Sequence, residues 1–195
     1  LLVFFSAACA AMVVVSAARG AESPALAPVS VRSADDPHYA DDQRQFQGIP
    51  SIAITPGGRL WATWYSGGAG EGPDNYVLLA TSADRGRTWS KPVQVIDPPS
   101  PVRGYDAVVW CDPRGQLWWF HAQTYGSWDG RAGVWARVST NADDPLPTWS
   151  EPRRIADGIM MNKPTVTRGG RWLFPIARWA LKPSASMPGG KRPPI

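Results

Sequence analysis

The sequence predicts an all-β fold, and two kinds of observation support that prediction. The composition combines 19 Gly and 20 Pro with 11 Trp in a chain of 195 residues. Many turn-forming residues mixed with many aromatic residues are typical of short strands joined by frequent turns. Short apolar runs, each followed by a turn that contains Gly or Pro, also recur along the chain in a repeating order.

The repeat can be followed from residue 49 onward. Leu60 in the first copy returns as Leu117 in the second, an offset of 57 (117 − 60), and Trp89 returns as Trp149, an offset of 60 (149 − 89). The first copy predicts strands over residues 49–55, 60–65, 76–81 and 92–96. The second predicts strands over residues 106–111, 117–122 and 134–138, and a third copy begins at residues 164–177.

Four short strands per repeat, at a period in this range, are the signature of β-propeller blades. A single blade cannot bury both of its faces, so neighbouring blades stack to form the core. The sequence therefore predicts two full four-stranded blades and about half of a third. Because a propeller closes into a ring, we expect the chain to be a fragment of a longer protein, with exposed blade edges.

One eight-residue turn, residues 82–89 (Ser-Ala-Asp-Arg-Gly-Arg-Thr-Trp), follows the third strand of the first blade. Asp84 is suited to bond the backbone N–H groups of the turn, and Gly86 to take a positive φ. We expect Trp89 to fill the space between neighbouring sheets. The second copy of the turn lacks the glycine, and Asp143 or Asp144 is expected to play the part of Asp84.

The first residues of the chain are apolar up to residue 18, and we predict a signal peptide over residues 1–21. A membrane anchor is the alternative, but the run is near the lower length limit for a span and its many Ala residues favour cleavage. We expect a secreted or periplasmic protein with no stable membrane insertion after cleavage. Residues 22–44 are interpreted as a linker or irregular lead-in, and residues 45–195 as a partial propeller.

Composition argues against several other classes of protein. The formal net charge of +4 is mild and the basic residues are scattered, so we predict no nucleic-acid binding. Cys111 is alone after signal cleavage and is expected to be a small buried residue of a strand. His38 and His121 are far apart, and no metal-ligand spacing is present. We therefore predict no metal and no cofactor, although propeller loops can hold a structural Ca²⁺.

The loops at one end of the blades should line the axial mouth, and they hold carboxylates, cations and aromatic side chains together. Carbohydrate sites use that mixture, because sugar rings stack on aromatic residues while charged groups bind hydroxyls or transfer protons. Turns after the third strands face the opposite end, so we expect their acids to be structural. The mouth segments are residues 44–48, 66–75, 101–106, 125–131, 160–163 and 178–179. Tryptophans inside strands are expected to be core residues: Trp61, Trp110, Trp118, Trp135 and Trp172.

The turn at residues 82–89 has the pattern Ser-x-Asp-x-Gly-x-Thr-Trp, and it resembles the Asp-box of sialidases (neuraminidases) and other β-propeller proteins. Sialidases also carry a motif aromatic-Arg-Ile-Pro before the first strand. Ile49 and Pro50 match that motif, whereas Gly48 stands in place of the arginine. In the family this arginine belongs to a cluster that grips the carboxylate of sialic acid. The resemblance covers roughly residues 46–180 and implies a six-bladed propeller when complete.

The same resemblance implies an acid/base Asp in the loop between the second and third strands of the first blade. Asp74 is the best positional match and Glu71 the second; the alternative for Asp74 is a carboxylate that caps the turn beside Pro73. Arg103 and Asp106 either form an ion pair that braces the mouth or contact the substrate. The other candidates for substrate binding are Gln47, Arg44, Trp64, Tyr65, Asn162, Lys163 and Arg178.

These residues lead to three hypotheses about function. The first is a secreted, sialidase-like glycoside hydrolase that cleaves terminal sugars from glycans, with retention through a covalent intermediate; its nucleophilic Tyr and remaining arginines would come from later blades. The second is a related carbohydrate-active propeller that acts on a non-sialic sugar by hydrolysis or elimination, and Gly48 favours it. The third is a propeller that binds glycans without catalysis.

Overall fold

The computed structural model describes residues 27–125 and 131–178. The predicted signal peptide, the loop over residues 126–130 and the last residues of the chain lie outside this part. In the part that the structure describes, no helix has the length and apolar character needed to cross a bilayer.

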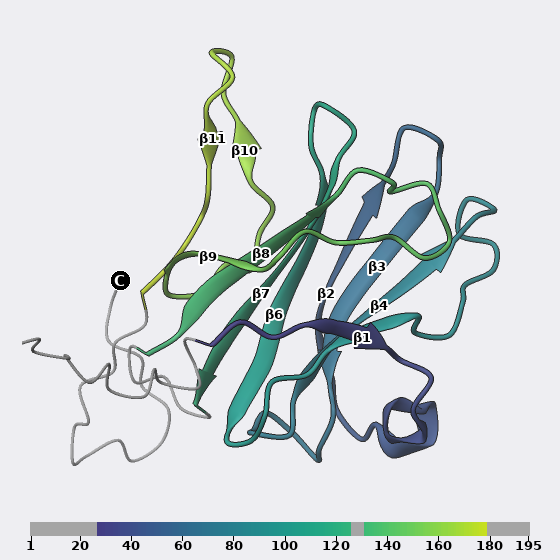
Figure 1. The fold of residues 1–195 in the computed structure, drawn as a ribbon, viewed down its shortest axis with the longest axis vertical. Helices are drawn as coiled ribbons and strands as arrows, with labels where there is room; N and C mark the ends of the chain where they lie inside the picture. The colour runs from purple at the N-terminus through teal and green to yellow at the C-terminus, as the bar shows by residue number, and fades with distance from the viewer. Residues whose placement is uncertain (1–26, 126–130, 179–195) are drawn as a thin grey trace, which may run out of the picture.

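Two antiparallel sheets form most of the molecule and lie side by side (Figure 1). The first contains β2 (Gln47–Ile54), β3 (Leu60–Ser66), β4 (Tyr76–Ser82) and β5 (Gln94–Ile96). The second contains β6 (Val102–Cys111), β7 (Leu117–Tyr125), β8 (Gly133–Ser139) and β9 (Arg153–Asp157). In each sheet these four strands follow one another in chain order, as in a propeller blade.

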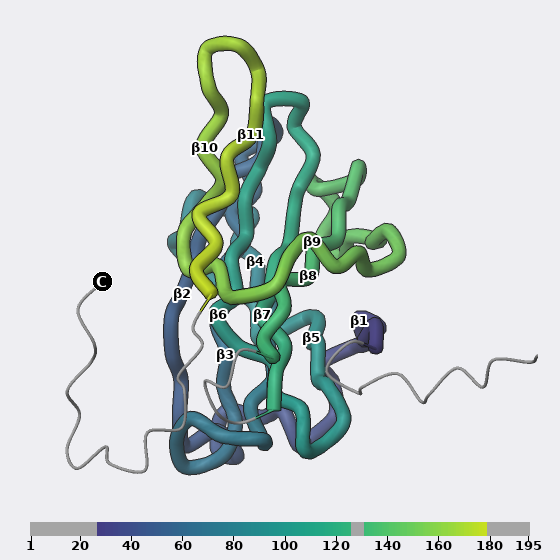
Figure 2. Tube along the Cα trace, turned by 90° about the vertical axis from the view of Figure 1, so that its left-hand side faces the viewer, coloured from purple at the N-terminus to yellow at the C-terminus, as the bar shows by residue number. Residues whose placement is uncertain are grey.

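A third, smaller unit is a hairpin of β10 (Thr165–Val166) and β11 (Trp172–Leu173), and it projects beyond the two blades in Figures 1 and 2. The bridge between Ile159 and Ala177 closes its base. Trp172 meets Trp110 and Trp118 in edge-to-face contacts, with ring centroids 4.9 and 5.4 Å apart. The prediction of an all-β propeller with two blades and part of a third is therefore confirmed.

The segment before the first blade is more ordered than the expected lead-in. Val31–Ser33 form strand β1, which pairs with β5 as a fifth strand, and two short 3-10 helices follow, η2 (Pro37–Tyr39) and η3 (Asp41–Gln43). The edge of β5 would otherwise present unpaired backbone groups, and β1 satisfies them. Tyr39 is buried on the first blade and donates a hydrogen bond to Asp97, 2.8 Å away.

The two blades meet across a buried apolar core that is pinned by tryptophan hydrogen bonds. Trp61 and Trp119 are fully buried in this core. The Trp119 indole N–H donates to the Thr63 hydroxyl at 2.8 Å, and the Trp61 indole N–H donates to the backbone carbonyl of Ala142 at 2.8 Å. Each bond joins one blade to the other, so the two bonds fix how the blades are aligned in addition to packing them together.

The turn at residues 82–89 has the predicted internal bonding. The Asp84 carboxylate accepts hydrogen bonds from the Thr88 backbone N–H at 2.9 Å, the Thr88 hydroxyl at 2.7 Å and the Ser82 hydroxyl at 2.8 Å. These bonds lower the pKa of Asp84 to about 2. Gly86 adopts a φ of 84°. Trp89, however, is 41% exposed and belongs to none of the described buried clusters.

The corresponding Trp149 explains that difference. Its indole N–H donates to Gln94 on β5 at 2.8 Å, and its ring lies 5.4 Å from that of Trp119. The tryptophan of a turn thus packs towards the preceding blade. The described residues contain no blade before the first, so Trp89 has no such surface.

The second copy of the turn corrects the sequence interpretation. Asn141 stands at the position that corresponds to Asp84 and takes its part: its side-chain oxygen accepts from the Ser139 hydroxyl at 2.7 Å and the Thr148 backbone N–H at 3.0 Å. Asp143 instead bonds the first blade. Its carboxylate accepts from the Gly57 backbone N–H at 3.1 Å and from the Thr55 hydroxyl. Asp144 accepts from the Asn141 amide at 2.8 Å.

Candidate active site

The inner strands of both blades begin with the same local irregularity. The pairing register shifts between Gly48 and Ser51 in β2 and between Tyr105 and Val108 in β6. Ile49 and Asp106 occupy equivalent positions in the two copies, and both have positive φ values, 41° and 45°. A bulge of this kind bends a strand and re-aims its side chains. In the second blade the residue at the bulge is Asp106, which carries a carboxyl group.

At this end of the blades a group of polar and aromatic side chains comes together from β3, the loop after it, and β6. The Tyr65 hydroxyl donates to the Glu71 carboxylate at 2.7 Å. The Arg103 guanidinium lies 3.6 Å from the other Glu71 oxygen and donates to the Asn75 side-chain oxygen at 3.3 Å. We call the group the Tyr65 cluster; its members are Tyr65, Glu71, Asn75, Arg103, Tyr105 and Asp106.

The cluster is mostly buried but opens to solvent at Glu71. Arg103 is 2% exposed, and its guanidinium carbon lies 4.1 Å from the Tyr105 ring centroid. The Glu71 side chain is 45% exposed. A cation, a solvent-facing carboxylate and two aromatic rings are thus held in one place. Such a set can bind sugar hydroxyls by charge-assisted hydrogen bonds.

Asp106 carries the buried carboxyl group of the cluster. It is 4% exposed, and its Oδ2 has no hydrogen-bond partner among the described residues. Burial raises its pKa to about 6; nearby Arg103 opposes the rise and Glu71 adds to it. Within the described part of the chain, Arg103 pairs with Glu71 and forms no ion pair with Asp106. The ion pair that we considered from the sequence is therefore not formed.

The two tyrosines of the cluster are buried, and the pKa of each is raised. Burial raises the pKa of Tyr65 well above its ordinary value, and the hydrogen bond to Glu71 raises it further. The pKa of Tyr105 is raised by burial and by Asp106. Both hydroxyls therefore stay protonated at neutral pH, and Tyr65 holds Glu71 in place.

Tyr65 also accounts for the glycine at position 48. Gly48 faces Tyr65 across the β2–β3 pair. A Cβ atom on residue 48 would lie 2.7 Å from the ring carbon Cζ of Tyr65 and 2.9 Å from its hydroxyl. The Tyr65 ring thus occupies the space that a side chain at position 48 would enter. An arginine fits there only if Tyr65 moves.

Asp74, the first candidate from the sequence, lies outside the Tyr65 cluster. It is exposed, and its carboxylate has no described hydrogen bond or ion pair. It lines a hollow of about 630 Å³ beside the N-terminal segment, together with Arg32, His38 and Asp97. Of the two predicted catalytic carboxylates, the structure brings only Glu71 to the cluster.

Arg44 and Trp64 lie in the small core on the other face of the first blade. Side chains alternate along β3, so Trp64 and Tyr65 point to opposite faces. Trp64 is half-buried against that core, and the Arg44 guanidinium lies 5.9 Å from its ring centroid. Arg44 also donates to the Tyr39 backbone carbonyl at 2.6 Å and pairs with Asp41. Both residues hold the N-terminal segment onto the blade.

The remaining candidates are dispersed. Gln47 is exposed at the start of β2. Lys163 donates to the backbone carbonyl of Ile52, in the middle of the inner strand, and Asn162 beside it is exposed. Arg178 is exposed and lies 3.8 Å from Asp157. Over the ranges that the structure describes, no side-chain hydrogen bond or ion pair joins any of these four to the Tyr65 cluster.

Asn75 and Tyr105 lie in two of the predicted mouth segments, but sequence reasoning did not single them out as site residues. Asn75 shapes the loop that carries Glu71: its amide donates to the carbonyls of Gly67 and Gly70, at 2.8 and 2.9 Å, and its oxygen accepts from the Gly72 N–H at 2.8 Å. An asparagine at the end of a Gly-rich loop was the available signal. Among the described residues, no group of three His, Cys, Asp or Glu side chains could hold a metal ion.

Comparisons with known proteins agree with this architecture. A family model described as "BNR repeat-like domain" matches residues 58–188, well over half of the chain. Among solved structures, the protein named Hadza microbial sialidase Hz136 matches with a TM-score of 0.53 and 21% sequence identity. The match covers 69% of this chain and 32% of the sialidase, so the chain spans about a third of that protein's length. No curated protein matches. The chain thus belongs to the BNR repeat-like domain family, and its sheets are blades of a sialidase-type β-propeller.

Proposed function

We propose that this chain forms part of the substrate-binding mouth of a sialidase-like glycoside hydrolase that removes terminal sugars from glycans. The observation that carries the proposal is the Tyr65 cluster. It joins the carboxyl groups of Glu71 and Asp106 to a buried cation and two aromatic rings, at the end of the blades where both inner strands begin. The family and the fold add support, because the matched structure is named a sialidase.

The two carboxyl groups of the cluster suit different parts in sugar chemistry. Asp106, with a pKa of about 6, is partly protonated near neutral pH and can donate a proton or a hydrogen bond. Glu71 is solvent-facing and accepts a hydrogen bond from Tyr65, so a sugar hydroxyl can approach it. The two carboxyl groups thus have different environments, one buried and one facing solvent. Glu71 is therefore better supported than Asp74 as the catalytic carboxylate of this loop.

One observation favours a second candidate, a related enzyme that acts on a non-sialic sugar. The Tyr65 ring fills the space where the sialidase motif places its arginine, and Arg103 is already paired with Glu71. An acidic sugar would therefore have to displace Glu71 or find its cation elsewhere. A neutral sugar can stack on the rings and bond Glu71 without that cost.

The test uses the full-length protein that contains this chain and a panel of fluorogenic glycosides: an α-sialoside, a β-glucuronide and neutral hexosides. We expect turnover of at least one substrate, reduced at least about a hundredfold in Glu71→Gln and in Asp106→Asn, as is typical for removal of a general acid or base. Asp74→Asn is the matched control and should retain activity. Cleavage of the sialoside would support the first candidate, and cleavage of the other substrates alone would support the second.

Two outcomes would contradict the proposal. Turnover that is unchanged in both Glu71→Gln and Asp106→Asn would place the chemistry outside the Tyr65 cluster. Glycan binding without turnover of any substrate would instead identify a non-catalytic glycan-binding propeller.

We also propose that residues 1–21 direct secretion or export to the periplasm. The apolar, Ala-rich run followed by small residues supports this. N-terminal sequencing of the mature protein should begin near residue 22, and an intact leader on the exported protein would contradict cleavage.

A further inference from the structure

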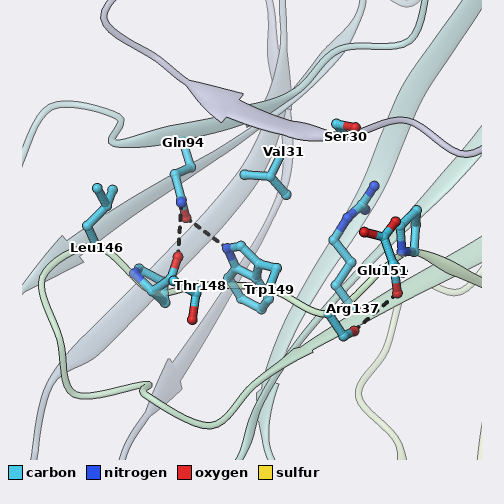
Figure 3. Close-up of a pocket in the computed structure, with 11 residues that line it drawn as sticks. Ser30, Val31, Gln94, Arg137, Leu146, Thr148, Trp149 and Glu151 are labelled. Atoms are coloured by element: carbon cyan, nitrogen blue, oxygen red, sulfur yellow. Dashed lines mark hydrogen bonds between the residues drawn. The ribbon is translucent and has the colours of Figure 1, made fainter.

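A second cavity lies at the rim between the blades, between the segment that leads into β1 and the second blade (Figure 3). It has a volume of about 360 Å³. Its walls include Ser30, Val31, Gln94, Arg137, Trp149 and Glu151. No residue of the Tyr65 cluster lines it, so it is separate from the candidate active site.

Arg137 is the unusual group of this cavity. It projects from β8 and is 1% exposed, and Figure 3 shows its side chain extending between Val31 and Glu151 towards Ser30. Neither of its terminal nitrogens has a hydrogen-bond partner among the described residues. Burial lowers its pKa only to about 10, so the guanidinium is charged at neutral pH. Glu151 is exposed and forms no ion pair with it within 4.0 Å.

The blade fold does not require this cation. The residue 57 positions earlier, at the equivalent place in the first blade, is Ala80, which is also buried. A buried charge without a partner is costly, and proteins retain one where something compensates it. Gln94 and Trp149 in the wall of the cavity are already satisfied: Gln94 bonds both the Trp149 indole, at 2.8 Å, and the carbonyl of Pro147, at 3.1 Å. Arg137 is therefore the group that a ligand would meet.

We propose that this cavity binds an oxyanion through Arg137, namely the carboxylate or sulfate group of an acidic sugar. Guanidinium groups bind such anions through paired, charge-assisted hydrogen bonds. The cavity volume lies within the range of small-molecule sites and accommodates a sugar ring beside the anion. The Glu151 carboxylate at the rim opposes the anion and competes for Arg137, so it weakens the binding.

Binding can be measured on the full chain by calorimetry and by thermal unfolding, with sulfate, glucuronate and glucose as probes at matched ionic strength. We expect sulfate and glucuronate to bind and glucose not to bind. Arg137→Met should weaken binding by about tenfold or more, the loss expected for charge-assisted hydrogen bonds. Glu151→Gln should tighten binding. Arg153→Met removes the same charge from an exposed position on β9 and should change nothing.

The variants also separate specific binding from general salt effects. Sulfate stabilises many proteins by exclusion from their surface, and that part of the thermal shift should remain in Arg137→Met. Arg137→Met should itself fold, because it replaces a buried, unpaired charge with an apolar side chain. If glucuronate binds with the expected dependence on Arg137, the site accepts an acidic sugar; if sulfate alone does so, the sugar part of the proposal is wrong. No binding to wild type or Glu151→Gln, or equal binding by Arg137→Met, would overturn the site.

Discussion

Replacing Asp106 by Asn should change the stability of the protein in a way that depends on pH. The free energy of unfolding of the variant, minus that of the wild type, should be larger at pH 8 than at pH 4. The pKa of Asp106 in the folded protein is raised from 3.8 to about 6 by burial. A carboxyl with a raised pKa stabilises the fold below its ordinary pKa, and this contribution is lost as the pH rises through about 6. The difference of about two pKa units corresponds to about 3 kcal/mol.

Asparagine cannot ionise, so the variant avoids this loss. Its amide still has to be accommodated where Oδ2 lacks a partner, at a cost of about 1–3 kcal/mol that does not depend on pH. We therefore expect the free energy of unfolding of the variant, minus that of the wild type, to increase by up to about 3 kcal/mol between pH 4 and pH 8. Whether the variant is more or less stable than the wild type at pH 4 depends on the cost of accommodating the amide.

Urea unfolding followed by tryptophan fluorescence, at a series of pH values from 4 to 8, measures this difference. Asp74→Asn is the matched control, because this exposed carboxylate has no described contact, and its difference should stay within about 0.5 kcal/mol. A difference for Asp106→Asn that is flat, or that falls as the pH rises, would refute the reasoning. It would mean that the pKa of Asp106 is not raised in the folded protein and that Arg103 compensates the buried carboxylate.

Two further predictions concern packing and the turns. Gly48→Ala should reduce the free energy of unfolding by about 1–3 kcal/mol, because its Cβ would lie 2.7 Å from the buried Tyr65 ring; wild-type stability in urea would contradict this account of position 48. Asn141→Ala should reduce it by about 1–2 kcal/mol, because three hydrogen bonds to its side-chain oxygen are lost. Asp144→Ala, at the edge of the same turn, should destabilise the protein less than Asn141→Ala. A larger loss of thermal stability in Asp144→Ala would show that Asp144, rather than Asn141, takes the part that Asp84 has in the first turn.

Much of the architecture followed from local patterns. The offset of 57 residues, which holds up to the second turn, shows which positions are equivalent, and it relates Asp84 to Asn141 and Ile49 to Asp106. The expectation that Asp143 or Asp144 takes the part of Asp84 was wrong, because residue type was given more weight than this spacing. The backbone position decides which side chain can reach the turn N–H groups, and an Asn oxygen accepts those bonds as an Asp oxygen does.

The candidate site was predictable in part. The loop after β3 and the start of β6 were expected to meet, and Tyr65, Glu71, Arg103 and Asp106 do lie together. Trp64 was grouped with them although its neighbour on the strand faces the opposite way. The alternation of side chains along a strand is a signal in the sequence itself, and it separates Trp64 from Tyr65.

The sequence by itself determined the repeat, the blades and the bonding within the first turn, because these depend on residues close together in the chain. Only the tertiary structure decided that Arg103 pairs with Glu71 rather than Asp106, that the Tyr65 ring excludes a side chain at position 48, and that Arg137 has no partner among the described residues. Each of these depends on contacts between strands or blades, where distance along the chain says little about distance in space. Burial then raised the pKa of Asp106 to about 6, whereas its residue type alone would have placed it near 3.8.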